Sequence, residues 1–125
     1  MASEATIQKS IINFINSLPY GIAENVSGNA EQSGRADINA CIDGRLWKIE
    51  VKTGDTAYGR KGETTKQRLY LERWARAGAL SCVVYNIDDI VYLLRGFEYI
   101  TKSLKVSGKG KWYDVQNKRW VDISY

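Results

Sequence analysis

Apolar residues recur at helical spacing in two stretches of the chain. The first covers residues 4–17; it follows Ser3, a residue type that often caps helices, and it stops before Pro19. The second covers about residues 66–77 and closes at Gly78. Each stretch therefore predicts one amphipathic helix.

The second helix is expected to turn one stripe of side chains toward the core. Its members, at helical spacing, are Tyr70, Leu71, Trp74 and Ala77. Gln67 begins this stripe one turn earlier, so its amide should point toward the neighbouring sheet.

Alternation of apolar and polar residues, which is typical of strands, dominates residues 34–52. Asp43-Gly44 lies within this stretch and is a strong signal for the two-residue turn of a β-hairpin. Residues 22–27 predict a short strand before the hairpin, and residues 80–85 predict a buried strand after the second helix.

The order of these elements predicts a mixed α/β fold. A short third helix should follow Asn86 or Asp88, and a second hairpin should cover residues 112–123. The second helix links the first hairpin to the buried strand, so those strands should pair in parallel. The length of 125 residues favours one domain over residues 1–125, with a core over about 3–100 and a basic extension over about 101–125.

The hairpin register brings two carboxylates together. With Asp43-Gly44 as the loop, counting back along both strands places Asp37 opposite Glu50. Lys52 lies two residues beyond Glu50 on the same strand face. The hairpin thus gathers two acids and a lysine on one face.

Like charges directly opposite one another in a sheet are destabilising, so the two carboxylates require an offsetting charge. A divalent cation would supply it. The ammonium of Lys52 and the guanidinium of Arg35 would supply it as well, and the cluster would then be structural.

Composition narrows the chemistry. The chain has no His, which excludes His-based triads, general bases and metal sites. A metal would rest on carboxylates, carbonyls and water, which suit Mg²⁺, Mn²⁺ or Ca²⁺. No apolar run is long enough to span a bilayer and the start lacks signal-peptide features, so an intracellular, cytoplasmic location is expected.

The charge distribution indicates a polyanionic partner. The net charge is +4, with a pI near 9.1. Residues 101–125 carry six basic and two acidic residues, and residues 45–76 carry nine basic and four acidic residues. One of these basic regions surrounds the paired carboxylates, which suits a substrate that is anionic and binds metal.

An acidic residue, a hairpin turn and then Glu-Val-Lys is a spacing that suits metal-dependent phosphodiester cleavage. Asp37 and Glu50 could bind Mg²⁺ beside the scissile phosphate, and Lys52 could orient or deprotonate the attacking water. Val51 points away from this face, which leaves its carbonyl available to a metal. Glu4 extends the apolar stripe of the first helix and could reach the site, or it could be an ordinary first-turn acid.

Gly34-Arg35-Ala36-Asp37, Ile49-Glu50-Val51-Lys52 and Gln67 together resemble the motifs of the PD-(D/E)xK nuclease superfamily, most closely its VRR-NUC (virus-type replication-repair nuclease) branch. The resemblance covers about residues 3–95 and departs from the family at Ala36, where proline is usual.

The resemblance implies a restriction-endonuclease-like αβββαβ core, with a small mixed sheet flanked by helices and a C-terminal β-hairpin extension. It implies catalytic roles for Asp37, Glu50, Lys52 and Gln67 and metal binding by Asp37, Glu50, Val51 and Glu4. The residues expected to contact DNA are Arg35, Arg60, Lys61, Lys66 and Arg68. The alternative for the loop that contains Arg60 and Lys61 is a solvated connection, which is the commoner fate of such loops, and the alternative for Arg68 is a solvated helix face.

The function that the resemblance implies is that of a Mg²⁺- or Mn²⁺-dependent DNA endonuclease. Stand-alone members of this branch resemble phage nucleases that cut branched DNA such as Holliday junctions, usually as homodimers. Two alternatives stay open: a non-catalytic nucleic-acid-binding module with a structural charge cluster, and a nuclease that needs a partner protein for specificity.

Overall fold

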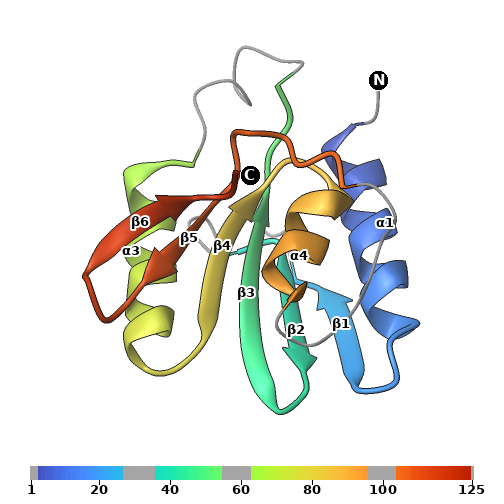
Figure 1. Ribbon diagram of the computed structural model, residues 1–125, viewed down its shortest axis with the longest axis horizontal. Coiled ribbons are helices and arrows are strands. Elements are labelled where there is room, and N and C mark those ends of the chain that lie inside the picture. The colour runs from blue at the N-terminus through green and yellow to red at the C-terminus, as the bar shows by residue number, and fades with distance from the viewer. Residues whose placement is uncertain (1–2, 27–35, 55–62, 96–103, 125) are drawn as a thin grey trace.

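A six-stranded sheet with the strand order β1-β2-β3-β4-β5-β6 organises the protein. The computed structural model describes residues 3–26, 36–54, 63–95 and 104–124 (Figure 1). The elements are α1 (Glu4–Asn16), β1 (Gly21–Asn25), β2 (Ile38–Ile42), β3 (Arg45–Val51), α3 (Thr65–Arg76), β4 (Leu80–Val84), α4 (Ile87–Leu93), β5 (Lys111–Asp114) and β6 (Arg119–Asp122). The predicted α/β architecture, a mixed sheet flanked by helices with a C-terminal hairpin, is confirmed.

The first hairpin has the predicted register. β2 and β3 are antiparallel, with Ile42 opposite Arg45 and Ile38 opposite Ile49. Both turn residues have positive φ, 50° at Asp43 and 83° at Gly44, as a two-residue turn that follows the twist of the strands requires. β3 and β4 are parallel through α3, while every other neighbouring pair in the sheet is antiparallel.

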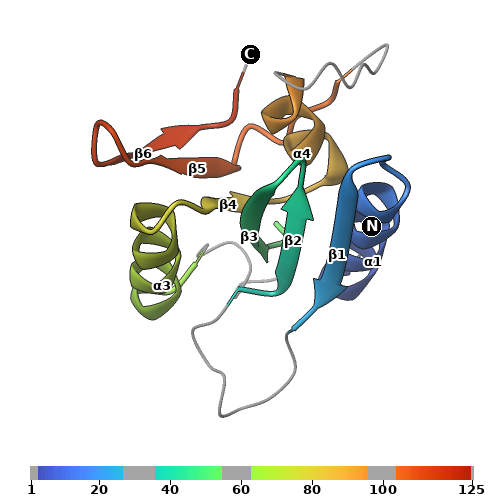
Figure 2. The ribbon, with the colours of Figure 1, turned by 90° about the horizontal axis from the view of Figure 1, so that it is seen from below.

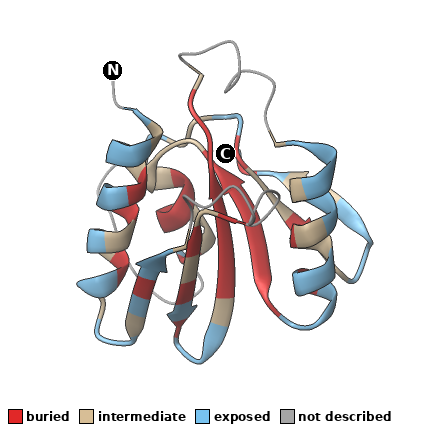
Figure 3. Cartoon of the chain, turned by 180° about the vertical axis from the view of Figure 1, so that it is seen from behind, coloured by how far each residue is buried: buried red, intermediate tan, exposed pale blue. Residues whose placement is uncertain are grey.

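Helices cover both faces of the sheet (Figure 2). Ile11 and Ile15 of α1 and Ile90 of α4 belong to a core cluster on one face, while Leu71 of α3 packs with Val83 on the other. β3 and β4 lie between these layers, so buried residues run along most of both strands (Figure 3). None of the described helices combines the length and the apolar composition that crossing a bilayer requires.

The predicted inward stripe of α3 is wrong at two positions. The buried residues of α3 are Leu71 and Ala75, whereas Ala77 and Trp74 are exposed, Trp74 by 37%. The Trp74 ring contacts the Lys48 ammonium, which lies 3.8 Å from the ring centroid. The indole therefore covers the charged ammonium of Lys48, a residue of β3, instead of filling the core.

The C-terminal hairpin extends the sheet. β5 pairs with β4, and the Trp120 indole of β6 donates a hydrogen bond to Glu72 of α3 at 2.9 Å. Trp120 also packs edge-on against Tyr113, with the ring centroids 5.4 Å apart. The aromatic residues of this hairpin thus pack against the domain itself.

Asp89, at the start of α4, anchors the segment that leads into β5. Its carboxylate is fully buried and accepts hydrogen bonds from the Tyr85 N–H and from both the N–H and the hydroxyl of Ser107, at 2.7–2.9 Å. The Ser107 hydroxyl oxygen in turn accepts the N–H groups of Lys109 and Gly110. One buried carboxylate thus ties the end of β4 to the segment before β5.

Asp89→Ala should lower the free energy of unfolding by about 3 kcal/mol, because it leaves buried donors without an acceptor. The matched control is Asp88→Ala, which removes a neighbouring carboxylate that accepts one exposed hydrogen bond, from Lys105 N–H. The control should cost less than about 1 kcal/mol. Urea denaturation of both variants measures the difference, and equal losses would contradict the anchoring role.

Candidate active site

The C-terminal ends of β3 and β4 and the N-terminal ends of α1 and α3 all lie at the same edge of the sheet, with the strand ends between the two helices (Figure 1). Lys52 follows the last residue of β3, and its N–H donates to the Val84 carbonyl at 2.9 Å, which continues the parallel pairing with β4. Glu50 and Lys52 therefore lie between the starts of the two helices. The predicted acid and lysine lie at the carboxyl end of β3, beside the carboxyl end of its parallel neighbour β4, which is the kind of position where open α/β sheets bind ligands.

Asp37 precedes β2 and turns its carboxylate toward the end of β3. Its backbone N–H donates to the Ile49 carbonyl at 3.1 Å, and its Oδ2 accepts the Val51 N–H at 2.8 Å. This bond fixes the carboxylate at the rung where the ladder between β2 and β3 ends. Val51 itself points into the core and is fully buried.

Glu50 is buried, with 2% of its surface exposed, and its two oxygens have different surroundings. Oε2 accepts a hydrogen bond from the Gln67 amide at 3.0 Å and lies 3.2 Å from the Lys52 ammonium. Oε1 is buried and has no hydrogen-bond partner among the described residues. A buried carboxylate oxygen without a partner is costly, and this one faces a site that already holds a second acid.

Burial and the charge of Asp37 raise the pKa of Glu50 from 4.5 to about 9, although the Lys52 charge opposes the rise. Burial alone would lower the pKa of Lys52, but the charges of Glu50, Glu4 and Asp37 outweigh burial and raise it. Without a cation, the site therefore retains a proton on Glu50 and a charged ammonium on Lys52.

Gln67 is held by a capping box. Its N–H donates to the Thr64 hydroxyl, and its side-chain oxygen accepts the Thr64 N–H at 3.0 Å. The amide nitrogen is then directed at Glu50, as the stripe of the helix predicted. The start of α3 and the position of this amide are fixed by the same contacts.

Glu4 lies at the first position of α1, behind Ser3, whose hydroxyl accepts the Thr6 N–H. Its charge contributes to the raised pKa values of Lys52 and Tyr85, so Glu4 influences the part of the site around Lys52. Within the described residues, no three acidic or cysteine side chains are grouped closely enough to hold a metal. Glu4 therefore does not join Asp37 and Glu50 in such a group.

A divalent cation fits the residues present. Glu50 offers a buried oxygen that no described residue bonds, and Asp37 offers a second carboxylate. Mg²⁺ is typically bound through one or two carboxylates together with water and substrate phosphates, so two acids suffice. Asp37, Glu50 and the Val51 carbonyl would hold it.

The structure describes two of the five residues expected to contact DNA. Arg35, Arg60 and Lys61 lie outside the described residues. Lys66 is exposed in the first turn of α3. Arg68 is 45% exposed and pairs with Glu72 along the same helix, at 3.7 Å.

Tyr85 belongs to the site region although the sequence analysis treated it only as the end of a strand. It follows β4 as Lys52 follows β3, and Val51 lies opposite Val84 in the parallel ladder. Burial and the charge of Glu63 raise the pKa of Tyr85, and the Lys52 charge opposes this. The predicted parallel crossover was the signal that could have placed Tyr85 beside Lys52.

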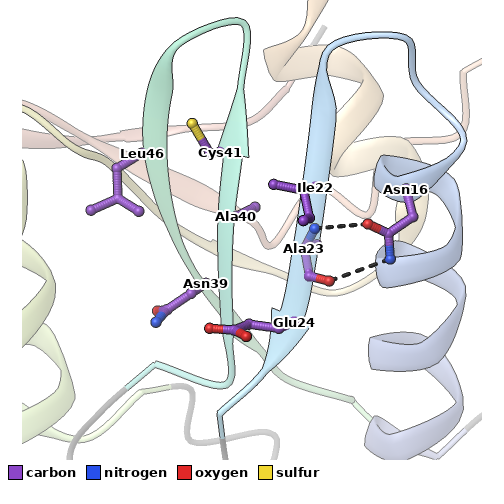
Figure 4. A pocket seen from close by; sticks show the side chains of 8 residues that line it. All are labelled: Asn16, Ile22, Ala23, Glu24, Asn39, Ala40, Cys41 and Leu46. Atoms are coloured by element: carbon purple, nitrogen blue, oxygen red, sulfur yellow. Dashed lines mark hydrogen bonds between the residues drawn. The ribbon is translucent and has the colours of Figure 1, made fainter.

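A cavity of about 560 Å³ lies elsewhere, over β1, β2 and β3 (Figure 4). It contains none of the predicted site residues and is lined by Asn16, Ile22, Ala23, Glu24, Asn39, Ala40, Cys41 and Leu46. Asn16 bonds both backbone groups of Ala23 and so joins α1 to β1. Asp37 and Glu50 therefore do not line this cavity.

No protein-family model matches the chain, and no curated protein matches it. A solved structure described as a VRR_NUC domain protein has the same fold, with a TM-score of 0.57 and 18% sequence identity. The match covers 78% of this chain and 88% of that chain. The predicted VRR-NUC-type fold is confirmed by this similarity, at an identity that shows the fold alone.

The raised pKa of Glu50 predicts that the metal-free protein loses stability as pH rises. The folded protein keeps this proton up to a pH of about 9, whereas the unfolded chain releases it near 4.5. Unfolding in this window releases a proton, so each pH unit lowers the free energy of unfolding by at most about 1.4 kcal/mol. Glu50→Gln has no such proton and should show a flatter profile.

Urea denaturation in EDTA, at intervals across this window, measures both profiles. Lys52 does not contribute there, because its pKa is raised above 10.5. Parallel profiles for wild type and Glu50→Gln would show that Glu50 titrates alike in the folded and unfolded states.

Proposed function

We propose that this protein is a Mg²⁺- or Mn²⁺-dependent DNA endonuclease. The observation that carries the proposal is the buried Oε1 of Glu50, which has no hydrogen-bond partner among the described residues and lies beside the Asp37 carboxylate, with Lys52 on the same edge of the sheet. The VRR-NUC-type fold supports it, because the neighbour with this fold is described as a VRR_NUC domain protein.

Asp37, Glu50 and the Val51 carbonyl are the groups that would hold the cation. When bound, a divalent cation polarises a phosphoryl oxygen and lowers the pKa of coordinated water. The protein's own contribution is to keep both carboxylates in place: the Val51 N–H holds Asp37, and the Gln67 amide holds Glu50. Gln67 is thus a positioning residue.

Lys52 is suited to hydrogen-bond donation and charge stabilisation. Its pKa is raised, so the side chain is an ammonium at neutral pH rather than a free base. An ammonium beside the two carboxylates can orient a water molecule and stabilise negative charge that develops on the phosphate. Of the two roles that the sequence allowed, orienting the water agrees better with this protonation state.

The substrate is proposed to be branched DNA, such as a four-way junction, cut by a homodimer of a phage-type enzyme in the cytoplasm of the host cell. The branch specificity and the homodimer rest on the family resemblance. The physical support is the net charge of +4 and the need to cut two strands symmetrically.

The short distance between the Lys52 ammonium and Glu50, 3.2 Å, favours a second candidate function. In that case the Lys52 ammonium and the proton on Glu50 stabilise the buried acid without a metal, and the protein binds nucleic acid without cutting it. The two functions differ in their dependence on the metal and on Lys52.

Lys52→Ala should reduce cleavage of labelled DNA at least about 100-fold in Mg²⁺ or Mn²⁺, because it removes a charge that acts on the transition state. EDTA should abolish cleavage by the wild type. Lys9→Ala, which removes an exposed lysine from α1, is the control for loss of one charge and should cut normally. Gel-based cleavage assays measure all three.

Tight DNA binding without cleavage in every metal would exclude the nuclease and leave the binding module. Retention of cleavage in Lys52→Ala would show that Lys52 has no role in the reaction.

A four-way junction should be cut at least about tenfold faster than a duplex of matched sequence, which corresponds to about 1.4 kcal/mol. Competition between the two labelled substrates in one reaction measures the ratio directly. Equal rates would contradict branch selectivity while leaving the nuclease proposal intact.

A further inference from the structure

Lys109, from the segment before β5, lies at the same edge of the sheet as Lys52. A Cβ atom added to Gly54, two residues after Lys52, would lie 2.6 Å from the Lys109 ammonium. The ammonium is also 5.8 Å from the centroid of the Tyr85 ring. Figure 1 shows this segment crossing the top of the sheet, over the ends of β3 and β4.

The backbone of this segment is fixed rather than loosely tethered. Buried Asp89 holds Ser107, and the Ser107 hydroxyl oxygen accepts the Lys109 N–H at 3.1 Å. Gly108 has a φ of 75°, which a glycine adopts without strain, and the Gly110 carbonyl accepts the Ile123 N–H at 2.8 Å. The chain thus presents Lys109 from a defined position.

The two lysines of this segment differ in their partners. Lys111 pairs with Glu63, just before α3. Within the described residues, no carboxylate lies within ion-pair distance of Lys109. Its distance to the Tyr85 ring is near the outer limit of a cation–π contact, about 6 Å, so the aromatic ring neutralises little of its charge. An exposed ammonium is thus available to an anion.

We propose that Lys109 binds a backbone phosphate of DNA beside the scissile phosphate that a cation held by Asp37 and Glu50 would engage. The proposal rests on the proposed function. An ammonium on a flexible stem is a point-charge phosphate ligand, and Gly54 leaves the space that it occupies. The C-terminal extension would then complete the substrate-binding edge rather than only lengthen the sheet.

The first test is the salt dependence of DNA binding by full-length protein in EDTA, so that no cleavage intervenes. Lys109→Ala should reduce the slope of log affinity against log salt by about 0.9 on duplex DNA, the loss of one phosphate contact. Lys118→Asn is the matched control: it removes one charge from the same extension, at the exposed hairpin turn. Asparagine tolerates the φ of 52° found there, and the slope should stay at the wild-type value.

A second variant tests the placement of the ammonium without removing its charge. Gly54→Ala should weaken binding in the wild-type background because the added Cβ displaces the Lys109 ammonium, and it should have no further effect in Lys109→Ala. Thermal unfolding of each variant confirms that the fold is retained.

The outcomes separate this proposal from the proposed function. Slopes for Lys109→Ala equal to those of wild type and Lys118→Asn would overturn the phosphate contact, whether or not the protein cuts DNA. Additive effects of Gly54→Ala and Lys109→Ala would overturn the placement. A reduced slope for Lys109→Ala in a protein that never cleaves DNA would retain the contact and reject the nuclease.

Discussion

The burial of the Glu50 carboxyl group is the constraint on which the site depends. An acid in this position requires a proton, a cation or a nearby ammonium, and the described part of the chain supplies hydrogen-bond donors for only one of its oxygens. The neighbouring Asp37 increases this demand, since its negative charge raises the pKa of Glu50 further. The arrangement therefore lowers the stability of the fold, and such costs are common at functional sites.

The parts of this site that the sequence predicted depend on local geometry. A two-residue turn at Asp43-Gly44 sets the hairpin register without reference to the rest of the fold, and that register places Asp37 near Glu50. Helical spacing likewise oriented Gln67 toward the sheet. Such inferences hold because strand and helix periods do not depend on tertiary packing.

The parts that the sequence did not predict depend on contacts between distant segments. Trp74 was assigned to the core, but its position is decided by Lys48 on another element. The approach of Lys109 to Gly54 depends on the hydrogen bonds by which buried Asp89 holds the segment before β5. The spacing of apolar and polar residues along the sequence does not predict such bonds. Tertiary hydrogen bonds of this kind determine the outer edge of the site.

The capping box of α3 restricts which residue can occupy position 67. The side chain must accept a hydrogen bond from the Thr64 N–H and donate one to Glu50, and the acceptor and donor atoms must be attached to the same terminal carbon. Glutamate accepts but cannot donate when ionised, and a shorter amide lacks the reach of one methylene. Glutamine meets both requirements, so the folding signal of this helix and the chemistry of the neighbouring acid specify the same residue.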